Sequence, residues 1–281
     1  MQRTKRFLSV QDISCLGQCS NTVMLPLLSA AGIETVVLPT ALLSTHTGGF
    51  PGYTFLDLSG EMEKILSHFA TLGVRFDGFL SGYLASAAQM DLLQRLLPPL
   101  MREGALRVVD PVMGDEGAFY SIYNVDFVTR MRAFCRGADA ITPNLTEACL
   151  LADVPYTGAR PTEAALREIL SRLAELDVRN ILITGVLADE TTISVVYRGE
   201  DGVTGRALAP YIPHRFHGTG DLFTGAFTGF LSRGVPLAAA AERAMRFLSH
   251  CIQDTLPEME EHWYGLCFEG RLGELTEKGG T

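Results

Sequence analysis

The sequence predicts an α/β protein with a mostly parallel central sheet and helices on both of its faces. Short apolar runs typical of buried strands alternate with helix patterns, in which apolar residues recur every three or four positions, along nearly the whole chain. Strands connected through helices in this way pair in parallel and are covered on both sides. No linker or break in composition divides the chain, so we expect residues 1–281 to form a single domain.

The expected elements follow from these patterns in chain order. Gly32 is expected to end the first helix, and residues 199–202 to form the turn of a final hairpin. Residues 42–55 are rich in Ser, Thr and Gly and are long enough for a lid or substrate loop. The polar tail from about residue 269 is expected to be frayed. The expected strands are 7–10, 34–38, 76–80, 106–109, 140–141, 181–183, 193–197 and 204–209, and the expected helices are 21–31, 58–72, 85–101, 124–136, segments between 144 and 176, and two that begin near 221 and 236.

Composition and charge exclude several classes of protein. The chain has 281 residues, a net charge of -9 and no basic block, which argues against a nucleic-acid partner. No segment reaches the roughly 18 apolar residues of a membrane span, and the apolar run after the basic residues 1–6 is too short for a signal peptide. The six cysteines form no Cys-x-x-Cys pair and indicate reduced thiols in a cytoplasmic protein.

Lysine is rare in this chain and occurs only as Lys5, Lys64 and Lys278. A P-loop NTPase needs a lysine in its glycine-rich loop, and a protein kinase needs a strand lysine. A pyridoxal-phosphate enzyme needs a buried lysine for its Schiff base. None of the three lysines has a suitable position, so these three classes are excluded.

The segment 217–221, His-Gly-Thr-Gly-Asp, is the strongest local indication of function. Apolar residues at helical spacing follow it, so a helix should begin near Asp221. Gly218 and Gly220 allow a tight turn, and the unpaired N–H groups at the helix start then form a site for an anion such as phosphate. Asp221 could accept the proton of a hydroxyl group that attacks this phosphate. The alternative is a plain glycine turn in which Asp221 only complements the helix dipole.

Polar residues also follow four of the apolar strands. Because ligands of open α/β sheets lie beyond the carboxyl ends of the strands, these residues can converge on one crevice. Carboxylates and an amide beside a phosphate site are ligands that magnesium accepts, often through water. The four segments are 81–83 (Ser-Gly-Tyr), 110–115 (Asp-Pro-Val-Met-Gly-Asp), 142–147 (Thr-Pro-Asn-Leu-Thr-Glu) and 184–185 (Thr-Gly). Together they indicate magnesium-dependent transfer of phosphate from a nucleotide to a small hydroxyl compound.

Each of these segments also has a purely structural alternative. Asn144 and Glu147 have the spacing of a helix capping box. Asp110 precedes a proline and could simply open a turn. The Thr-Gly pair at 184–185 could be a plain exit from a strand, and Tyr83 could only cover the edge of the core. The joint occurrence of all four segments with the glycine-rich helix start favours the functional interpretation.

These segments together resemble the ribokinase-like superfamily, and within it they are most similar to the pyridoxal (pyridoxamine) kinases. The resemblance extends from about residue 9 to about residue 247. It implies a three-layer α/β/α fold and ATP-dependent phosphorylation of the 5′-hydroxyl group of a vitamin B6 vitamer. It also implies a homodimer and a requirement for Mg²⁺ together with a monovalent cation, K⁺ or Na⁺.

The same resemblance implies a role for each site residue. The catalytic base would be Asp221. The anion hole would be formed by Gly218, Thr219 and Gly220. The ATP side would be formed by Asp110, Thr142, Asn144, Thr184, Gly185, Ile212 and His217. The magnesium ligands would be Asp115 and Glu147. The pyridine ring would be surrounded by Asp12, Thr47, Tyr83 and Tyr120.

Three positions depart from the family pattern. Asp12 and Ile13 stand where many members have Ser-His, and because that Ser contacts the vitamer, Asp12 is expected to tune which vitamer is preferred. The alternative is that Asp12 points to solvent and caps the turn before Asn21. Thr45 stands where Asn is common, and Gly185 is smaller than the usual residue. None of these positions belongs to the transfer machinery.

Three other functions remain open alternatives. Hydroxymethylpyrimidine (phosphate) kinases of the same fold share the segments 110–113 and 142–144, but they usually carry Cys at the position of Asp221. A sugar kinase would have a longer insertion for its substrate. A non-catalytic ligand carrier would not need an intact base, anion hole and metal set.

Overall fold

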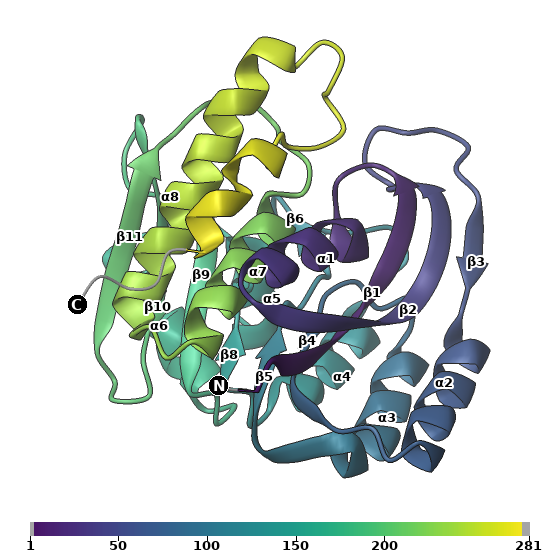
Figure 1. The fold of residues 1–281 in the computed structure, drawn as a ribbon. Coiled ribbons are helices and arrows are strands. Elements are labelled where there is room, and N and C mark those ends of the chain that lie inside the picture. The colour runs from purple at the N-terminus through teal and green to yellow at the C-terminus, as the bar shows by residue number, and fades with distance from the viewer. Residues whose placement is uncertain (1–2, 277–281) are drawn as a thin grey trace.

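A computed structural model describes residues 3–276 of the chain, and within that range a single large sheet forms the centre of the fold (Figure 1). Its strands are β1 (Lys5–Leu16), β2 (Ile33–Thr45), β3 (Phe55–Asp57), β4 (Phe76–Ser81), β5 (Met101–Val109), β8 (Ala140–Ile141), β9 (Asn180–Leu187), β10 (Thr192–Arg198) and β11 (Thr204–Pro210). The short strands β6 (Gly114–Asp115) and β7 (Ala118–Phe119) form a separate two-stranded pair.

The strand order of the large sheet is β11-β10-β9-β8-β5-β4-β1-β2-β3. The six strands from β9 to β2 are paired in parallel, whereas β10, β11 and β3 are antiparallel to their neighbours. The pairing of β10 with β11 confirms the expected hairpin. The mostly parallel sheet confirms the fold class that the alternating pattern predicts.

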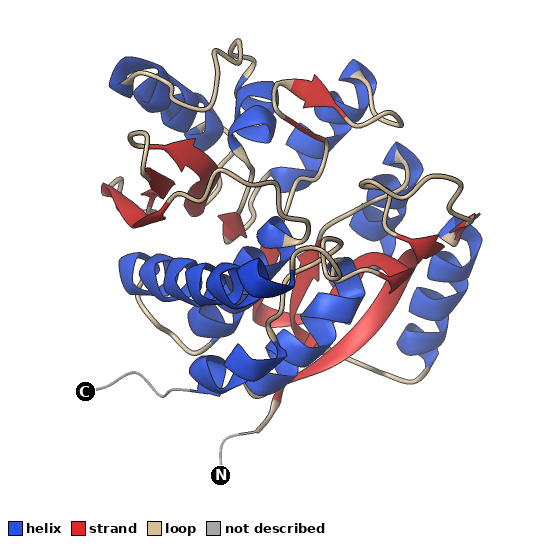
Figure 2. Ribbon diagram, turned by 90° about the horizontal axis from the view of Figure 1, so that it is seen from above, coloured by secondary structure: helices blue, strands red, loops and turns tan. Residues whose placement is uncertain are grey.

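Helices cover both faces of the sheet and complete three layers (Figure 2). One face carries α2 to α6, whose buried side chains share a core with residues of the sheet. The other face carries α1, α7 and α8 and has its own apolar core. The helices are α1 (Ser20–Ala30), α2 (Ser59–Thr71), α3 (Ala87–Leu96), α4 (Val125–Cys135), α5 (Leu145–Ala152), α6 (Glu163–Ala174), α7 (Thr219–Ser232) and α8 (Leu237–Thr255).

Two glycines of α7 allow it to pack closely against α1. A Cβ atom at Gly225 would lie 2.9 Å from Leu27, and one at Gly229 would lie 2.8 Å from the Cβ of Ala31. Real Cβ atoms do not approach so closely. The requirement for glycine is strict at Gly229, where the neighbour is another Cβ atom, whereas at Gly225 the end of the flexible Leu27 side chain would have to move. The close contact with α1 fixes the start of α7, which carries the glycine-rich segment.

The region of β1, β2 and β3 differs from the expectation. Strands of four and five residues and a long loop at 42–55 were expected, but β1 and β2 are twelve and thirteen residues long. Both continue past an irregularity between Gln11 and Ile13, and the far end of β2 pairs with β3. The polar residues Gln11, Asp12, Ser14 and Thr40 are buried in these extensions, so the strands continue there without the apolar pattern that would reveal them in the sequence.

Two helical expectations were also wrong. The helix expected at 85–101 ends as α3 at Leu96, because Pro98 and Pro99 lack N–H donors and start the 3₁₀ turn η1 (Pro98–Leu100). The tail expected to be frayed forms η3 (Glu269–Thr276) instead. Leu275 is buried there and Arg271 pairs with Asp254 of α8, so the apolar and ionic contacts hold this segment. Residues 277–281 of the expected tail lie outside the described part of the chain.

Between residues 3 and 276, none of the helices combines the length and the apolar character that crossing a membrane requires.

Candidate active site

The start of α7 has the geometry of an anion site. Gly218 precedes the helix with a positive φ of 79°, and a Cβ atom there would clash with the carbonyl oxygen of Gln18. Only glycine fits this position, and the tight turn exposes the first N–H groups of α7. The N–H groups of Thr219 and Gly220 have no partner within the helix, as expected for a first turn. With the helix dipole they favour a bound phosphate.

Asp221 lies in the first turn of α7, directly beside these N–H groups. Burial raises the pKa of its carboxyl group to about 7, and the nearby Asp12 carboxylate contributes to the rise, while the Ser20 backbone opposes it. A carboxyl group with a pKa near neutrality can exchange a proton with a reacting hydroxyl group at neutral pH. Asp221 therefore has the position and the proton affinity of a general base.

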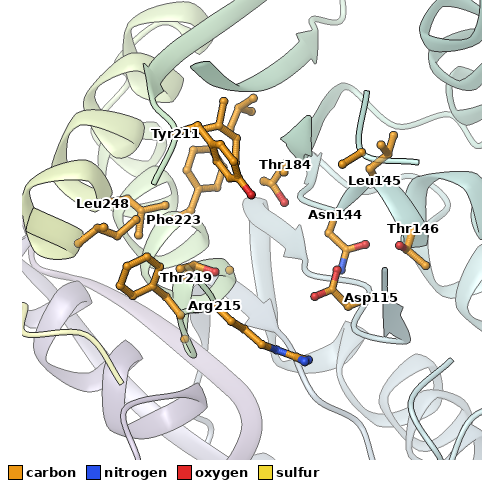
Figure 3. Close-up of a pocket in the computed structure, with 18 of the residues that line it drawn as sticks. Asp115, Asn144, Leu145, Thr146, Thr184, Tyr211, Arg215, Thr219, Phe223 and Leu248 are labelled. Atoms are coloured by element: carbon orange, nitrogen blue, oxygen red, sulfur yellow. The ribbon is translucent and has the colours of Figure 1, made fainter. Parts of the chain in front are cut away.

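A cleft of about 660 Å³ opens beside the start of α7. It brings together residues from the carboxyl ends of β5 and β8, from β9 and from the segment before α7. Figure 3 shows Thr219 and Phe223 on one side, Asn144 and Asp115 on the other, and the Arg215 side chain extending between them. The expected residues that line this cleft are Asp110, Asp115, Tyr120, Thr142, Asn144, Glu147, Thr184, Gly185, Ile212, His217, Gly218, Thr219, Gly220 and Asp221.

The cleft is strongly acidic for a place that is expected to hold phosphates. Among the described residues that line it, Arg215 is the only arginine or lysine. The carboxyl groups that line it are Asp110, Asp115, Glu116, Glu147 and Asp221. Burial raises the pKa of Asp110 well above its usual value, and the carboxyl groups of Glu147 and Asp221 raise it further. A divalent cation would relieve this repulsion and neutralise the phosphates of a nucleotide.

The described residues contain no cluster of three or more His, Cys, Asp or Glu side chains arranged to hold a metal ion alone. Magnesium usually needs only one or two carboxylates, and it completes its shell with water and substrate phosphates. Asp110 and Asp115 fit this requirement, since both line the cleft beside the anion site. The donor set therefore suits magnesium that arrives with a nucleotide.

Asn144 and Glu147 form the capping box of α5, so the structural alternative for this pair is confirmed. The Asn144 side chain accepts a hydrogen bond from Glu147 N–H at 2.9 Å, and Glu147 Oε2 accepts one from Asn144 N–H at 2.9 Å. Glu147 Oε1 also accepts the N–H of Met113 at 2.9 Å, and Asn144 Nδ2 donates to the Gly114 carbonyl at 2.7 Å. Both side chains thus hold the segment 110–115 against α5, and a metal contact of Glu147 would share its oxygens with these bonds.

Thr184 and Gly185 do not mark the end of a strand, so that expectation was wrong. They lie inside β9, at a register shift opposite residues 194–196 of β10. Gly185 has a φ of 73°, which accommodates the bulge, and bulges often direct side chains into active sites. The bulge explains how both residues line the cleft although the strand continues to Leu187.

The residues expected around the pyridine ring do not all meet in this cleft. Tyr120 lines it, whereas Asp12, Thr47 and Tyr83 are not among its lining residues. Thr47 is exposed in the loop after β2, and Tyr83 is half-buried after β4. Burial raises the pKa of Tyr83, and Asp12 adds to this shift, which places the two residues near each other.

Asp12 is only 5% exposed, so the alternative that it points to solvent is wrong. Its Oδ2 accepts a hydrogen bond from the Ser14 hydroxyl at 2.9 Å. Burial raises the pKa of Asp12, and hydrogen bonds from Ser20 and Ser14 oppose the rise. Because the negative charge of Asp12 also affects Asp221, it belongs to the environment of the candidate base.

An aromatic cluster that the sequence did not indicate joins three distant segments. It consists of His46, Phe50, His217 and Trp263. The ring centroids are 4.8 Å apart for His46 and His217 and 4.6 Å apart for Phe50 and Trp263. His46 Nδ1 accepts the Gly48 N–H and its Nε2 donates to the Tyr264 carbonyl, which fixes a neutral ring. The cluster thereby ties the loop after β2 to the C-terminal segment, next to the glycine-rich turn.

Sequence reasoning also missed several residues that line the cleft itself. Arg215 lies inside the segment 212–217 that the resemblance places at the adenine and ribose, and the structure adds that its side chain lines the cleft. Tyr211, Phe223 and Leu248 form part of an apolar end of the cleft, which suits a nucleobase (Figure 3). The position of Tyr211 directly after β11 is the signal that could have indicated it, since ligands of such sheets lie near strand ends.

The three layers, the parallel sheet and the cleft at the glycine-rich helix start define a ribokinase-like α/β protein. A family model described as phosphomethylpyrimidine kinase matches residues 28–264. The chain therefore belongs to the phosphomethylpyrimidine kinase family.

Solved structures and a curated relative support the same relationship. A Bacteroides thetaiotaomicron protein assigned as a phosphomethylpyrimidine kinase is 36% identical, with a TM-score of 0.94 and coverage of 99% of this chain and 96% of the other. An orthorhombic form of that protein with pyridoxal gives 37% identity and a TM-score of 0.92, covering 98% and 96%. Pyridoxal kinase from Lactobacillus plantarum is 31% identical with a TM-score of 0.89, covering 96% of each chain.

The pyridoxine/pyridoxal/pyridoxamine kinase of Bordetella pertussis is 29% identical over 250 residues, which are 84% of each chain. These relatives confirm the resemblance to the pyridoxal kinases of the ribokinase-like superfamily.

Proposed function

We propose that the protein transfers the γ-phosphoryl group of ATP to the 5′-hydroxyl group of a vitamin B6 vitamer, in the salvage of pyridoxal 5′-phosphate. The observation that carries the proposal is the place of Asp221. Its carboxyl group lies beside the unpaired N–H groups of the α7 start, at the edge of a cleft of about 660 Å³. The pyridoxal in the structure of the Bacteroides relative supports a vitamer as the acceptor.

In the proposed reaction the 5′-hydroxyl oxygen attacks the γ-phosphorus while its proton passes to the Asp221 carboxylate. The new O–P bond forms as the bond between the γ-phosphorus and the bridging oxygen of ADP breaks, and ADP leaves with that electron pair. A pKa of about 7 leaves Asp221 largely ionised at slightly alkaline pH, where it can accept the proton.

The remaining groups of the cleft are proposed to bind and orient the nucleotide. The N–H groups of Thr219 and Gly220 would donate to phosphate oxygens, where charge develops during transfer. Asp110, Asp115 and Glu147 would hold magnesium, directly or through water, and the ion would neutralise the phosphates. Further contacts to the phosphates, the ribose and the base would come from Thr142, Asn144, Thr184, Gly185, Ile212 and His217.

The vitamer is proposed to lie on the other side of Asp221, toward Asp12, Thr47, Tyr83 and Tyr120. The resemblance to pyridoxal kinases further supports a monovalent cation, K⁺ or Na⁺, and a homodimer in the cytoplasm. It also supports a single kinase domain, in agreement with the continuous sheet that joins β1 to β11.

Hydroxymethylpyrimidine (phosphate) kinase is the second candidate function. The description of the matching family model favours it. Asp221 argues against it, because the enzymes of that activity usually carry Cys at this position. The two activities differ in the acceptor alone, so a comparison of acceptors decides between them.

The test is a steady-state assay with Mg·ATP and pyridoxal, pyridoxamine, pyridoxine or hydroxymethylpyrimidine in turn. Formation of pyridoxal 5′-phosphate is followed by its absorbance, and the ADP released is measured with all four acceptors. We expect the highest kcat/KM with a vitamin B6 vitamer. A higher kcat/KM with hydroxymethylpyrimidine would assign the second candidate, and ADP release without any acceptor dependence would exclude both.

A further inference from the structure

We infer that Thr224 is a positioning residue for the nucleotide, which orients the hydroxyl group of Thr142 toward a phosphate oxygen. The inference rests on the assignment of the cleft to a nucleotide in the proposed function. Thr224 does not line the cleft itself, whereas Thr142 does. Thr224 would therefore influence the reaction only through its contact with Thr142.

Thr224 connects three elements of the site through one buried hydroxyl group. It lies one turn after Asp221 on α7 and is 1% exposed. Its Oγ1 donates to Thr142 Oγ1 at 2.9 Å and to Asp110 Oδ2 at 3.3 Å. Thr142 directly follows β8 and Asp110 directly follows β5. The hydrogen bonds of Thr224 thus connect α7, which carries Asp221, with Thr142 and Asp110 at the edge of the sheet.

Each of the two hydroxyl groups has one proton, and this limits the direction in which the hydrogen bonds between Thr224, Thr142 and a ligand can run. The single proton of the Thr224 hydroxyl group is shared in a three-centre hydrogen bond between Thr142 Oγ1, at 2.9 Å, and Asp110 Oδ2, at 3.3 Å, so Thr142 Oγ1 is an acceptor in this contact. The hydroxyl proton of Thr142 then remains for another acceptor. Within residues 3–276 none of the side-chain hydrogen bonds uses it, and Thr142 lines the cleft. We assign this proton to a phosphate oxygen of a bound nucleotide, which would accept a hydrogen bond from Thr142.

The backbone of Thr142 is held as well, since its N–H donates to the Val109 carbonyl at 3.1 Å. The remaining freedom of this residue is the rotation of its hydroxyl group. A single hydrogen bond from Thr224 removes that freedom before the nucleotide binds. Such preorganisation strengthens binding because less entropy is lost when the ligand arrives.

Thr228 provides an internal comparison on the same helix. It lies one turn after Thr224, is fully buried, and its Oγ1 has no hydrogen-bond partner in the described part of the chain. Both threonines stand before a glycine on the side of α7 that is buried. A threonine on this face does not need a partner for the helix to pack. The bond from Thr224 is therefore a specific feature of the site and not a general requirement of the helix.

The test compares the nearly isosteric variants Thr224→Val and Thr228→Val with the conservative variant Thr224→Ser. The KM values for Mg·ATP and for pyridoxal are measured, together with the Kd of Mg·ADP by calorimetry. Loss of a preorganised hydrogen bond to a charged oxygen should raise the KM for Mg·ATP and the Kd of Mg·ADP about tenfold in Thr224→Val. Thr224→Ser and Thr228→Val should stay within about twofold of the wild type, and the KM for pyridoxal should not change.

A purely structural tie would give a different result. Thr224→Val would then lower kcat in proportion to the folded fraction and leave both the KM for Mg·ATP and the Kd of Mg·ADP unchanged, which overturns the inference. An equal effect of Thr228→Val also overturns it. If the wild type phosphorylates no vitamer but Thr224→Val still weakens Mg·ADP binding about tenfold, the proposed function fails and the inference stands. If the wild type binds no Mg·ADP, both fail.

Discussion

The two sides of Asp221 are built in different ways. On the nucleotide side, the expected residues lie in the segments after β5 and β8, in β9 and between β11 and α7, and they line one cleft. On the vitamer side, Asp12 lies in an extended strand, Thr47 in an exposed loop and Tyr83 after β4, and of the expected ring contacts only Tyr120 reaches the cleft.

This difference teaches which part of the site is fixed by the sheet and which part depends on other contacts. The nucleotide side rests on buried strands and on the capping box of α5. The loop after β2, which carries Thr47, is held instead by the aromatic cluster of His46, Phe50, His217 and Trp263, which joins three segments. We therefore expect changes on the nucleotide side to affect all acceptors equally, and changes on the vitamer side to alter the choice among them.

The largest effect is expected for Asp221, which belongs to both sides. Asp221→Ala should lower kcat by about 100- to 10,000-fold, the usual contribution of a positioned base. The Kd of Mg·ADP should change little, since the N–H groups of the α7 start remain. Steady-state kinetics and calorimetry on the same preparation measure both quantities.

Asp126→Asn is the matched control, because Asp126 lies in the first turn of α4 and not in the cleft. It should leave kcat unchanged while it removes a comparable interaction with a helix dipole. Near-normal turnover in Asp221→Ala would remove the residue from the mechanism and leave it a role in the helix start.

The next largest effect is expected for Asp12 and concerns the choice of vitamer. A buried carboxylate can pair with a protonated pyridine nitrogen or with the ammonium group of pyridoxamine, whereas Ser offers only a neutral hydrogen bond. Asp12→Ser should therefore change the ratio of kcat/KM for pyridoxamine over pyridoxal by about tenfold. The KM for Mg·ATP should stay constant. An unchanged ratio would show that Asp12 has no part in recognition of the vitamer.

A smaller effect is expected for the aromatic cluster. Phe50→Leu removes the ring contact with Trp263 and should raise the KM for pyridoxal about two- to tenfold, with an unchanged KM for Mg·ATP. Phe55→Leu is the control, because Phe55 is exposed on β3. Trp263 is the only tryptophan of the chain, so its fluorescence reports on this region directly. Equal effects of both variants, or no fluorescence change on addition of pyridoxal, would contradict a role of the cluster at the vitamer side.

The smallest effect is expected for Glu147 and concerns stability. Burial raises its pKa to about 8 from a usual value of 4.5. The resulting stabilisation of the folded protein is complete below pH 4.5 and is lost as the pH rises through about 8. Glu147→Gln does not titrate and loses one acceptor oxygen, so its Tm should lie below that of the wild type at pH 5. The difference should shrink by a few degrees toward pH 8.

Glu163→Gln, in the exposed first turn of α6, is the matched control, because it makes the same exchange of residue types away from the cleft. The magnesium concentration for half-maximal activity should also rise in Glu147→Gln. A stability loss that is the same at every pH, with unchanged magnesium dependence, would leave Glu147 only its capping role.

The sequence allowed the layers, the hairpin and the cleft to be predicted, because these follow from local patterns. Alternating strands and helices indicate the parallel sheet, and polar residues after β5 and β8 indicate the cleft at its edge. Gly218 and Asp221 were recognised because a turn and a helix start have local signatures.

Features that depend on distant contacts could not be predicted in this way. The contact of Trp263 with Phe50 and the burial of Leu275 join segments far apart in the chain. The extension of β1 and β2 depends on pairing between polar stretches, which apolar patterns do not reveal. Thr224 stands in an apolar helix pattern, where its residue type alone gives no sign of the bond to Thr142.

The proton transfer to Asp221 is the central claim, and the pH dependence of kcat/KM for pyridoxal tests it most directly. The wild type should show a rise through a pKa of about 7, since only the ionised carboxyl group of Asp221 accepts the proton. In Asp12→Asn the rise should move to lower pH, because the removal of a neighbouring negative charge lowers the pKa of Asp221. A profile that is flat between pH 6 and 8, or one that Asp12→Asn leaves in place, would contradict the account.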